Sequence, residues 1–189
     1  MAQAVSQAQG ALEALSALSA ESWFARPWFS LSGAKVSFAA ELGKLSGHLL
    51  HIGTDAFALG KEGRAVRCRF VSVVCVHFRD RDGRGRGGRV FYTQHWPMRV
   101  ASIWEKLFVE TSCSVSLAAA IAERFPRMGD RLLVHIDANP DASHRSGDYV
   151  HTLANMVMGY GFRYVLKPKA WASSRAADFI ARGQHLRVV

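Results

Sequence analysis

The pattern of apolar and polar residues in the first half of the chain predicts three antiparallel strands. Residues 49–55 and 65–78 are rich in apolar and β-branched side chains, and a glycine-containing turn separates them. Residues 80–89 (Asp-Arg-Asp-Gly-Arg-Gly-Arg-Gly-Gly-Arg) combine glycine with charge, which is typical of a hairpin tip. Residues 90–96 are predicted to return as the third strand, which ends before Pro97.

A long helix is predicted over residues 99–125. At about 100° per residue, Glu110 falls at the edge of its apolar face, whereas Glu105 falls well outside it, on the expected solvent face. Glu110 is therefore the acid that is able to face the sheet. The apolar face recurs at intervals of three and four residues and comprises Val100, Ile103, Trp104, Leu107, Phe108, Thr111, Val115, Ala118, Ala122 and Phe125.

Strands and helices alternate in the second half of the chain. The order β-β-β-α-β-α-β-α predicts an α/β fold with one mixed five-stranded sheet and helices on its faces. A short helix capped by Ser37 precedes these elements. The second-half elements are a strand at 132–137, a polar loop at 138–147, a helix at 148–159, a strand at 162–167, and a helix from Ser173 or Ser174 to Ala181.

The N-terminal residues differ in composition from the rest. Residues 1–22 are rich in Ala, Ser and Gln, and an aromatic segment follows at 22–29. Leucines at intervals of three fit a short helix, but poor caps indicate loose attachment or dependence on a protein partner. We therefore expect a helical extension and linker over residues 1–30 and a domain over 31–189.

Composition narrows the class of protein. The net charge of +9 and the pI of about 10.0 suit a polyanion such as nucleic acid, although an inert basic surface would give the same balance. Three scattered cysteines are too few for a disulfide framework or a thiolate zinc site. No secretory signal or membrane-spanning run is present, so we expect a cytoplasmic protein.

Four acids stand out against this basic background. Asp55 and Asp137 end predicted strands, where ligands of mixed sheets bind, and Glu110 faces the same region. Asp178 lies in the last predicted helix. Such acids repel one another unless cations neutralise them, and oxygen ligands suit Mg²⁺ or Mn²⁺.

Each acid also has an ordinary explanation. Asp55 and Asp137 could make turn hydrogen bonds, and Glu110 could be solvated. Asp178 could be an acid in the first turn of a helix, where the helix dipole favours negative charge. Their common placement in one sheet favours a site. Two ions about 4 Å apart could activate a water and stabilise the leaving oxygen in phosphodiester hydrolysis.

The four acids lie in four short motifs: Gly-Thr-Asp55, Glu110-Thr-Ser, His-Ile-Asp137, and Lys167-Pro-Lys-Ala-Trp-Ala-Ser-Ser-Arg-Ala-Ala-Asp178. Together these motifs resemble the ribonuclease H-like YkuK family of predicted bacterial nucleases, over roughly residues 28–183. The resemblance implies a ribonuclease H-like fold. It also implies that Asp55 contacts two metal ions, with Glu110, Asp137 and Asp178 completing the catalytic and metal-binding set.

The chain departs from the family pattern at two places. Ala56 stands where the family tends to have serine, and Ser102-Ile-Trp104 replaces a His-rich stretch before the Glu-Lys pair of the long helix. Both departures concern substrate contacts and full activity, and neither affects the four acids.

Basic residues near these acids are candidates for nucleic-acid contacts. Each could equally be an ordinary solvated side chain, and a lone loop histidine is more often that. The arginine-glycine tip resembles segments that track nucleic-acid backbones. The candidates are Arg84, Arg86, Arg89, His144, Arg145, Lys167, Lys169 and Arg175.

Three functional hypotheses follow. The first is a nuclease that cleaves RNA, DNA or a hybrid with two Mg²⁺ or Mn²⁺ ions. The second is a weakly active or inactive nucleic-acid-binding or scaffold protein on the same fold. In the third, the acids bind nothing and the basic surface serves a protein partner.

Overall fold

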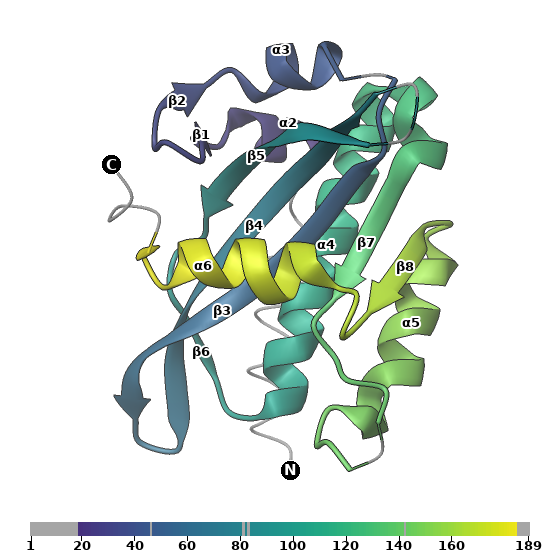
Figure 1. The fold of residues 1–189 in the computed structure, drawn as a ribbon. Coiled ribbons are helices and arrows are strands. Elements are labelled where there is room, and N and C mark those ends of the chain that lie inside the picture. Colours follow the sequence, from purple (N-terminus) through teal and green to yellow (C-terminus); the bar gives the residue numbers. More distant parts are fainter. Residues whose placement is uncertain (1–18, 46, 81, 83, 142, 185–189) are drawn as a thin grey trace.

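The computed structural model describes residues 19–184 except 46, 81, 83 and 142, and its centre is a mixed eight-stranded sheet (Figure 1). The strand order is β2-β1-β5-β4-β3-β7-β8, and β6 pairs with β4 outside this path. The strands are β1 (Trp28–Ser30), β2 (Lys35–Val36), β3 (Leu50–Glu62), β4 (Ala65–Arg79), β5 (Gly85–Gln94), β6 (Met98–Val100), β7 (Leu132–Ile136) and β8 (Arg163–Leu166).

The sheet confirms the predicted α/β class and the predicted order of its main elements. The five predicted strands correspond to β3, β4, β5, β7 and β8. The sheet is nevertheless larger than predicted, because β1, β2 and β6 also join it. These strands have two or three residues each, too few for an alternating pattern to be visible in the sequence.

Helices cover both faces of the sheet (Figure 1). One face packs on α4 and α5, and the other carries η3 and α6. The helices are α2 (Ala20–Ala25), α3 (Phe38–Gly43), α4 (Ile103–Arg124), α5 (Val150–Gly159) and α6 (Asp178–Ala181). Short 3₁₀ turns lie at η1 (Pro126–Arg131) and η2 (Gly147–Tyr149), and η3 (Ala172–Ala177) is a π-helix.

Strand β4 shows why the middle of the sheet reads as a nearly continuous apolar run. Val71 and Val73 point into the core under η3 and α6, whereas Phe70 and Val74 point into the larger core under α4. All four side chains are fully buried. A strand that is covered on both faces favours apolar residues at nearly every position; Ser72, between the two valines, is buried with a hydrogen-bond partner.

Strand β3 is longer than predicted. Asp55 therefore lies inside a strand, whereas the sequence suggested a strand end. The parallel pairing of β3 with β7 stops at Gly53 and His135, and Asp137 follows the end of β7 directly. Asp55 is thus two residues beyond the last parallel pair, at the point where β3 continues and β7 does not.

The start of η3 also differs from the prediction. The helix begins at Ala172 after Trp171, and neither Ser173 nor Ser174 caps it. Both serine hydroxyls instead donate hydrogen bonds back to the carbonyl of Ala170. A hydroxyl used in this way lies within the helix and cannot serve as its cap.

Glu105 was expected on the solvent face of α4, and this expectation is wrong. Its side chain is buried because its Oε2 accepts a hydrogen bond of 2.6 Å from the backbone of Ala101. Ser102 in turn accepts a hydrogen bond from the backbone of Glu105. The two bonds satisfy backbone donors at the start of α4 and resemble a capping box, except that the Glu105 carboxylate accepts from Ala101 and not from the N-cap residue Ser102.

The aromatic segment near the N-terminus packs on the domain. Trp23 and Trp28 are buried, and Trp28 stacks on Phe38 with ring centroids 3.7 Å apart. Residues 1–18, where the extension was expected to be helical, lie outside the described residues. The division at residue 30 stays a prediction.

Within the described part of the chain, no helix is long and apolar enough to cross a membrane. The three cysteines are free and buried.

We expect His95 to make the fold less stable in mild acid. Its ring is 7% exposed, with Nε2 2.8 Å from the Ser72 hydroxyl. Burial, and then the charge of Arg26, lower the pKa of His95 from 6.5 to about 3. Between these values the unfolded chain binds a proton that the folded chain does not, so stability present above pH 6.5 is lost below it.

The expected contribution of His95 is a loss of about 1.4 kcal/mol per pH unit below pH 6. Urea unfolding at a series of pH values from 7.5 to 5 measures this slope, which should be smaller in His95→Gln. His144→Gln, at an exposed position, serves as the control and should keep the wild-type slope. A wild-type slope in His95→Gln would contradict the assignment.

Candidate metal centre

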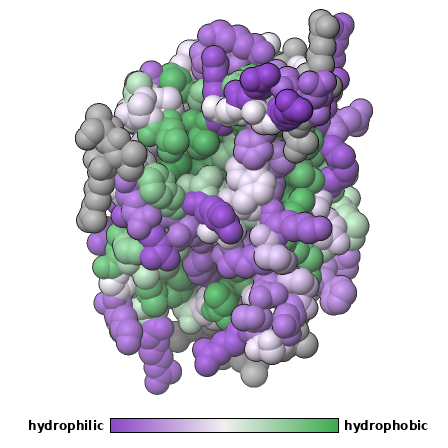
Figure 2. All heavy atoms as spheres, viewed as in Figure 1, coloured by the Kyte–Doolittle hydropathy of each residue, from purple (hydrophilic) through white to green (hydrophobic). Residues whose placement is uncertain are grey.

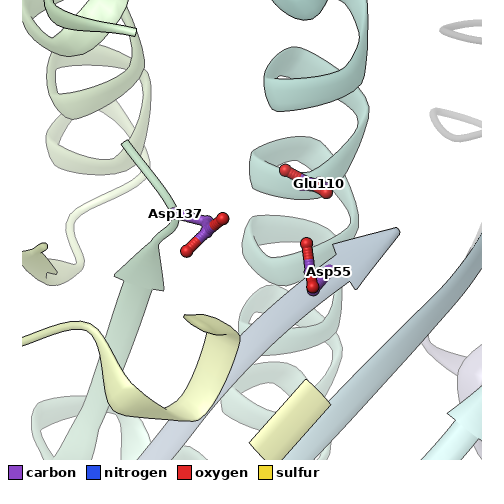
Figure 3. Close-up of side chains that lie close together, drawn as sticks. All are labelled: Asp55, Glu110 and Asp137. Atoms are coloured by element: carbon purple, nitrogen blue, oxygen red, sulfur yellow. The ribbon is translucent and has the colours of Figure 1, made fainter. Parts of the chain in front are cut away.

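Three of the four predicted acids lie close together where the parallel pairing of β3 and β7 ends (Figure 3). Asp55 comes from β3, Glu110 from the middle of α4, and Asp137 from the residue after β7. One carboxylate oxygen from each lies within 4.8 Å of the others. The structure thus brings together three acids that are 55 and 27 residues apart in the chain.

Two of these carboxylates are buried, and the third is nearly so. Asp55 is 5% and Glu110 is 2% exposed, and the side chain of Asp137 is 11% exposed. Glu110 Oε2 has no hydrogen-bond partner among the described residues. A buried carboxylate oxygen without a partner is costly, and a divalent cation is a ligand that would satisfy it.

Burial and mutual repulsion raise the pKa of two of the acids. The pKa of Glu110 lies well above its usual range because burial raises it, and the lowering by Lys106 is not sufficient to offset burial and the charge of Asp55. The pKa of Asp137 is raised by burial and then by Asp55, against the opposing charge of Lys167. Both directions show that this pocket disfavours negative charge without an additional cation.

Two lysine ammonium groups already contact the acids. Lys106 Nζ lies 3.0 Å from Asp55 Oδ1 and 2.5 Å from Glu110 Oε1. Lys167 Nζ lies 3.0 Å from each carboxylate oxygen of Asp137. Lys167 was predicted as a nucleic-acid contact, whereas Lys106 was missed, although its spacing of four residues from Glu110 places both side chains on one helix face.

Asp178 lines a surface hollow that Asp55 and Asp137 also line, but it lies outside the group of three acids. The hollow has a volume of about 440 Å³ and also includes Ser174 and Arg182. Asp178 Oδ1 accepts a hydrogen bond of 2.6 Å from Arg182 Nε. The part of Asp178 in metal binding stays a prediction.

The donor set fits a hard divalent cation. Mg²⁺ takes oxygen ligands at about 2.0–2.1 Å in an octahedron and usually keeps several waters. Three carboxylates from three elements can each supply one oxygen, and the hollow beside them leaves room for water. Asp55, Glu110 and Asp137 are the residues that would hold such an ion.

The sequence profile of the ribonuclease H-like family matches residues 37–182. The chain belongs to the ribonuclease H-like family. Comparisons with curated proteins and with solved structures gave no match. The narrower assignment to the YkuK group therefore stays a prediction. The matched residues include every strand and helix that contributes to the group of three acids.

Some of the basic residues predicted to contact nucleic acid lie in or near the acid group of this ribonuclease H-like domain, and the others lie at the β4–β5 hairpin. Lys167 lies in the site, and exposed Lys169, His144 and Arg145 belong to segments that follow β8 and β7. Exposed Arg175 lies on η3. Seen from the side of α6, hydrophilic side chains spread over the middle of this face (Figure 2). These positions are consistent with a polyanion that lies across the site.

Arg84, Arg86 and Arg89 lie far from the acids. Arg89 pairs with Val76 of β4, whereas Asp55 pairs with Val71. The five intervening steps at about 3.4 Å correspond to about 17 Å along the strand. The hairpin tip is also shorter than predicted, since β5 begins at Gly85. Arg86 and Arg89 form ion pairs with Asp80 and Glu41.

A cluster of three histidines that was not predicted from the sequence contacts the start of η3, where the Ala172 N–H donates to His135 Nδ1 at 3.4 Å. His135 is buried, and its Nε2 lies 2.9 Å from Nδ1 of His51. Trp171 stacks on His77 at 4.5 Å. Burial, and then the charge of His51, lower the pKa of His135 to about 3, so the ring is neutral. The only signal in the sequence was a histidine within each of three apolar strands.

We expect Glu110→Gln to stabilise the protein in the absence of metal. The amide has nearly the same shape and removes a buried negative charge, and Lys106 keeps Asp55 as a partner. The expected gain in the free energy of unfolding at pH 7 is about 1 kcal/mol or more. Because the raised pKa of Glu110 means that stability is lost as the pH rises above 4.5, the gain should shrink toward pH 4.5.

Urea unfolding in EDTA measures this gain. Glu123→Gln is the matched control, because Glu123 is exposed on the same helix, and it should change stability by less than about 0.5 kcal/mol. A destabilised Glu110→Gln would show that the carboxylate stabilises the metal-free fold.

Proposed function

We propose that the protein is a metal-dependent nuclease that hydrolyses phosphodiester bonds in RNA, DNA or an RNA/DNA hybrid. The observation that carries this proposal is the largely buried group of Asp55, Glu110 and Asp137 in a ribonuclease H-like fold, in which one Glu110 oxygen has no partner among the described residues. Inert surface acids are neither buried nor drawn together from three elements. We place the protein in the YkuK group and in the cytoplasm.

The roles of the residues follow from their positions. A bound Mg²⁺ or Mn²⁺ lowers the pKa of a coordinated water and stabilises the leaving oxygen. Asp55, whose charge acts on both Glu110 and Asp137, is proposed to contact two ions. Glu110 and Asp137 would hold one of them, and Asp178 would help to hold the other.

The basic residues around the hollow are proposed to bind the substrate. Lys169, Arg175 and Arg145 are exposed, and a net charge of +9 attracts a polyanion. Arg84, Arg86 and Arg89 would contact a substrate long enough to extend to the other end of the sheet. Such contacts position a backbone without reading its sequence.

One observation favours a second candidate, a nucleic-acid-binding protein with little or no activity. Lys106 and Lys167 already place a positive charge on each of the three carboxylates. A site neutralised by its own lysines has less need of metal. Ala56, at the position of a family serine, favours the same alternative.

A cleavage panel separates the two candidates. Single-stranded, duplex, hybrid and branched substrates are incubated with Mg²⁺ or Mn²⁺, and Asp55→Asn is purified in parallel to exclude a contaminating nuclease. Thermal melting with and without Mn²⁺ reports binding to the native protein. The nuclease proposal expects cleavage and a rise in Tm that both depend on Asp55. Salt-dependent nucleic-acid binding without either effect would support the second candidate, and absence of binding would favour a protein partner.

A further inference from the structure

Lys106 is held differently from the other lysines of the surface. Its Nζ contacts carboxylates from two elements, Asp55 on β3 and Glu110 on α4, and its side chain is 23% exposed. Lys44, in a surface pair with Glu41, is 63% exposed. The Lys106 ammonium is therefore a fixed charge inside the site, which a flexible surface lysine is not.

The position of this ammonium limits the room for cations. Lys106 lies against Asp55 Oδ1 and Glu110 Oε1, and Glu110 Oε2 is a buried oxygen for which the described residues offer neither a hydrogen bond nor an ion pair. The three carboxylates offer oxygens within 4.8 Å of one another, close enough for all three to bind a single ion once they move to within about 4.2 Å, twice the Mg²⁺–oxygen distance. Asp178, the acid on which a second ion would depend, is paired with Arg182.

The net charge of the site also argues for a single divalent ion. Three carboxylates and two ammonium groups sum to −1, taken over Asp55, Glu110, Asp137, Lys106 and Lys167. One divalent ion changes the sum to +1, whereas two would change it to +3 in a mostly buried pocket. Uncompensated buried charge is costly, so the second ion would be disfavoured while Lys106 stays charged.

We propose that Lys106 supplies the positive charge that a second divalent ion would otherwise supply, so that the free protein takes up one ion per chain. The inference rests on the proposed metal site and specifies it further: Lys106 sets the number of ions. It also replaces the expectation of two ions for the protein without substrate. A bound phosphodiester would bring negative charge of its own and is not part of this inference.

The test counts Mn²⁺ ions bound by the metal-free full-length protein, by isothermal titration calorimetry and by electron paramagnetic resonance of free Mn²⁺. Wild type should bind one ion per chain. Lys106→Met should bind two, with the first at least about tenfold tighter, because a repelling charge next to it is gone. Lys106→Arg keeps the charge and should bind one. Lys44→Met controls for the loss of a lysine elsewhere and should also bind one.

Lys106→Gln has the same expectation as Lys106→Met and serves if the methionine variant does not fold. The wild-type stoichiometry needs no variant at all. Two ions in wild type, or one ion in both Lys106→Met and Lys106→Gln, would overturn the inference and leave the metal site intact. No Mn²⁺ binding by wild type or by any variant would instead overturn the proposed metal site, and the inference with it.

Discussion

Asp137→Asn is expected to lower metal-dependent cleavage by at least about 10³-fold. Asparagine keeps the size of the side chain and an oxygen that can accept a hydrogen bond from Lys167, so the fold should persist. It removes one of three negative charges, and with it the ligand from the residue after β7. The measurement is kcat/KM on the best substrate of the panel, together with the Tm gain on adding Mn²⁺, which should disappear.

The control for this change is Asp148→Asn, an exposed acid in the segment between β7 and α5. It should keep the wild-type rate and the full Tm gain. If Asp137→Asn keeps more than a tenth of the activity, the carboxylate does not hold a catalytic ion. If both variants lose activity equally, the loss reflects the loop rather than the metal.

Comparing the activity of Asp178→Asn with that of Asp137→Asn tests whether Asp178 belongs with the other three acids. The sequence motifs treat them alike, whereas the structure places three within 4.8 Å and pairs the fourth with Arg182. A small effect at Asp178 would agree with the one-ion site that Lys106 permits. An effect as large as that of Asp137 would assign Asp178 a metal of its own once substrate is bound.

The central sheet and the acid group were predictable because both follow from local patterns. Apolar runs identify β4 and β7, and helical phase separates Glu110 from Glu105. Two acids near the ends of parallel pairing must then lie close together. Asp55 was predicted correctly as a neighbour of Asp137 even though its strand continues for seven more residues.

What the sequence did not reveal depends on contacts between distant segments. In the sequence, Lys106 resembles an ordinary solvated lysine of a helix. Only the structure shows that Asp55 lies beside it. Glu105 falls outside the apolar face, but a hydrogen bond to the Ala101 backbone buries it. The sequence predicts Ser173 as a helix cap, but its hydroxyl donates a hydrogen bond to the carbonyl of Ala170. Periodicity reports the face of an element, and it carries no information about a single partner in space.

The position of η3 depends on one small residue of β3. A Cβ atom at Gly53 would lie 2.5 Å from Ser173 N and 2.7 Å from the carbonyl carbon of Ala172. Both are backbone atoms, which cannot rotate away as a side-chain end could. Gly53 therefore allows the π-helix to cross directly over the sheet, and this crossing brings Asp178 to the hollow beside Asp55.

Gly53→Ala is accordingly expected to lower the free energy of unfolding by about 3 kcal/mol, the upper part of the range for overpacking. The helix must shift or detach, so the variant should also lose cleavage activity out of proportion to its remaining folded fraction. Urea unfolding and kcat/KM on the same preparation measure both effects. Protease cleavage within residues 167–184 of the folded variant would locate the displaced segment.

Gly60→Ala is the matched control in the same strand, because a Cβ at that position would meet no atom of the described residues within 4 Å. Both variants gain β propensity from the added methyl group, so any difference between them reflects the contact with η3. Gly60→Ala should be neutral or slightly stabilising. A Gly53→Ala protein as stable and active as Gly60→Ala would show that η3 does not need this close approach, and that the location of Asp178 does not depend on it.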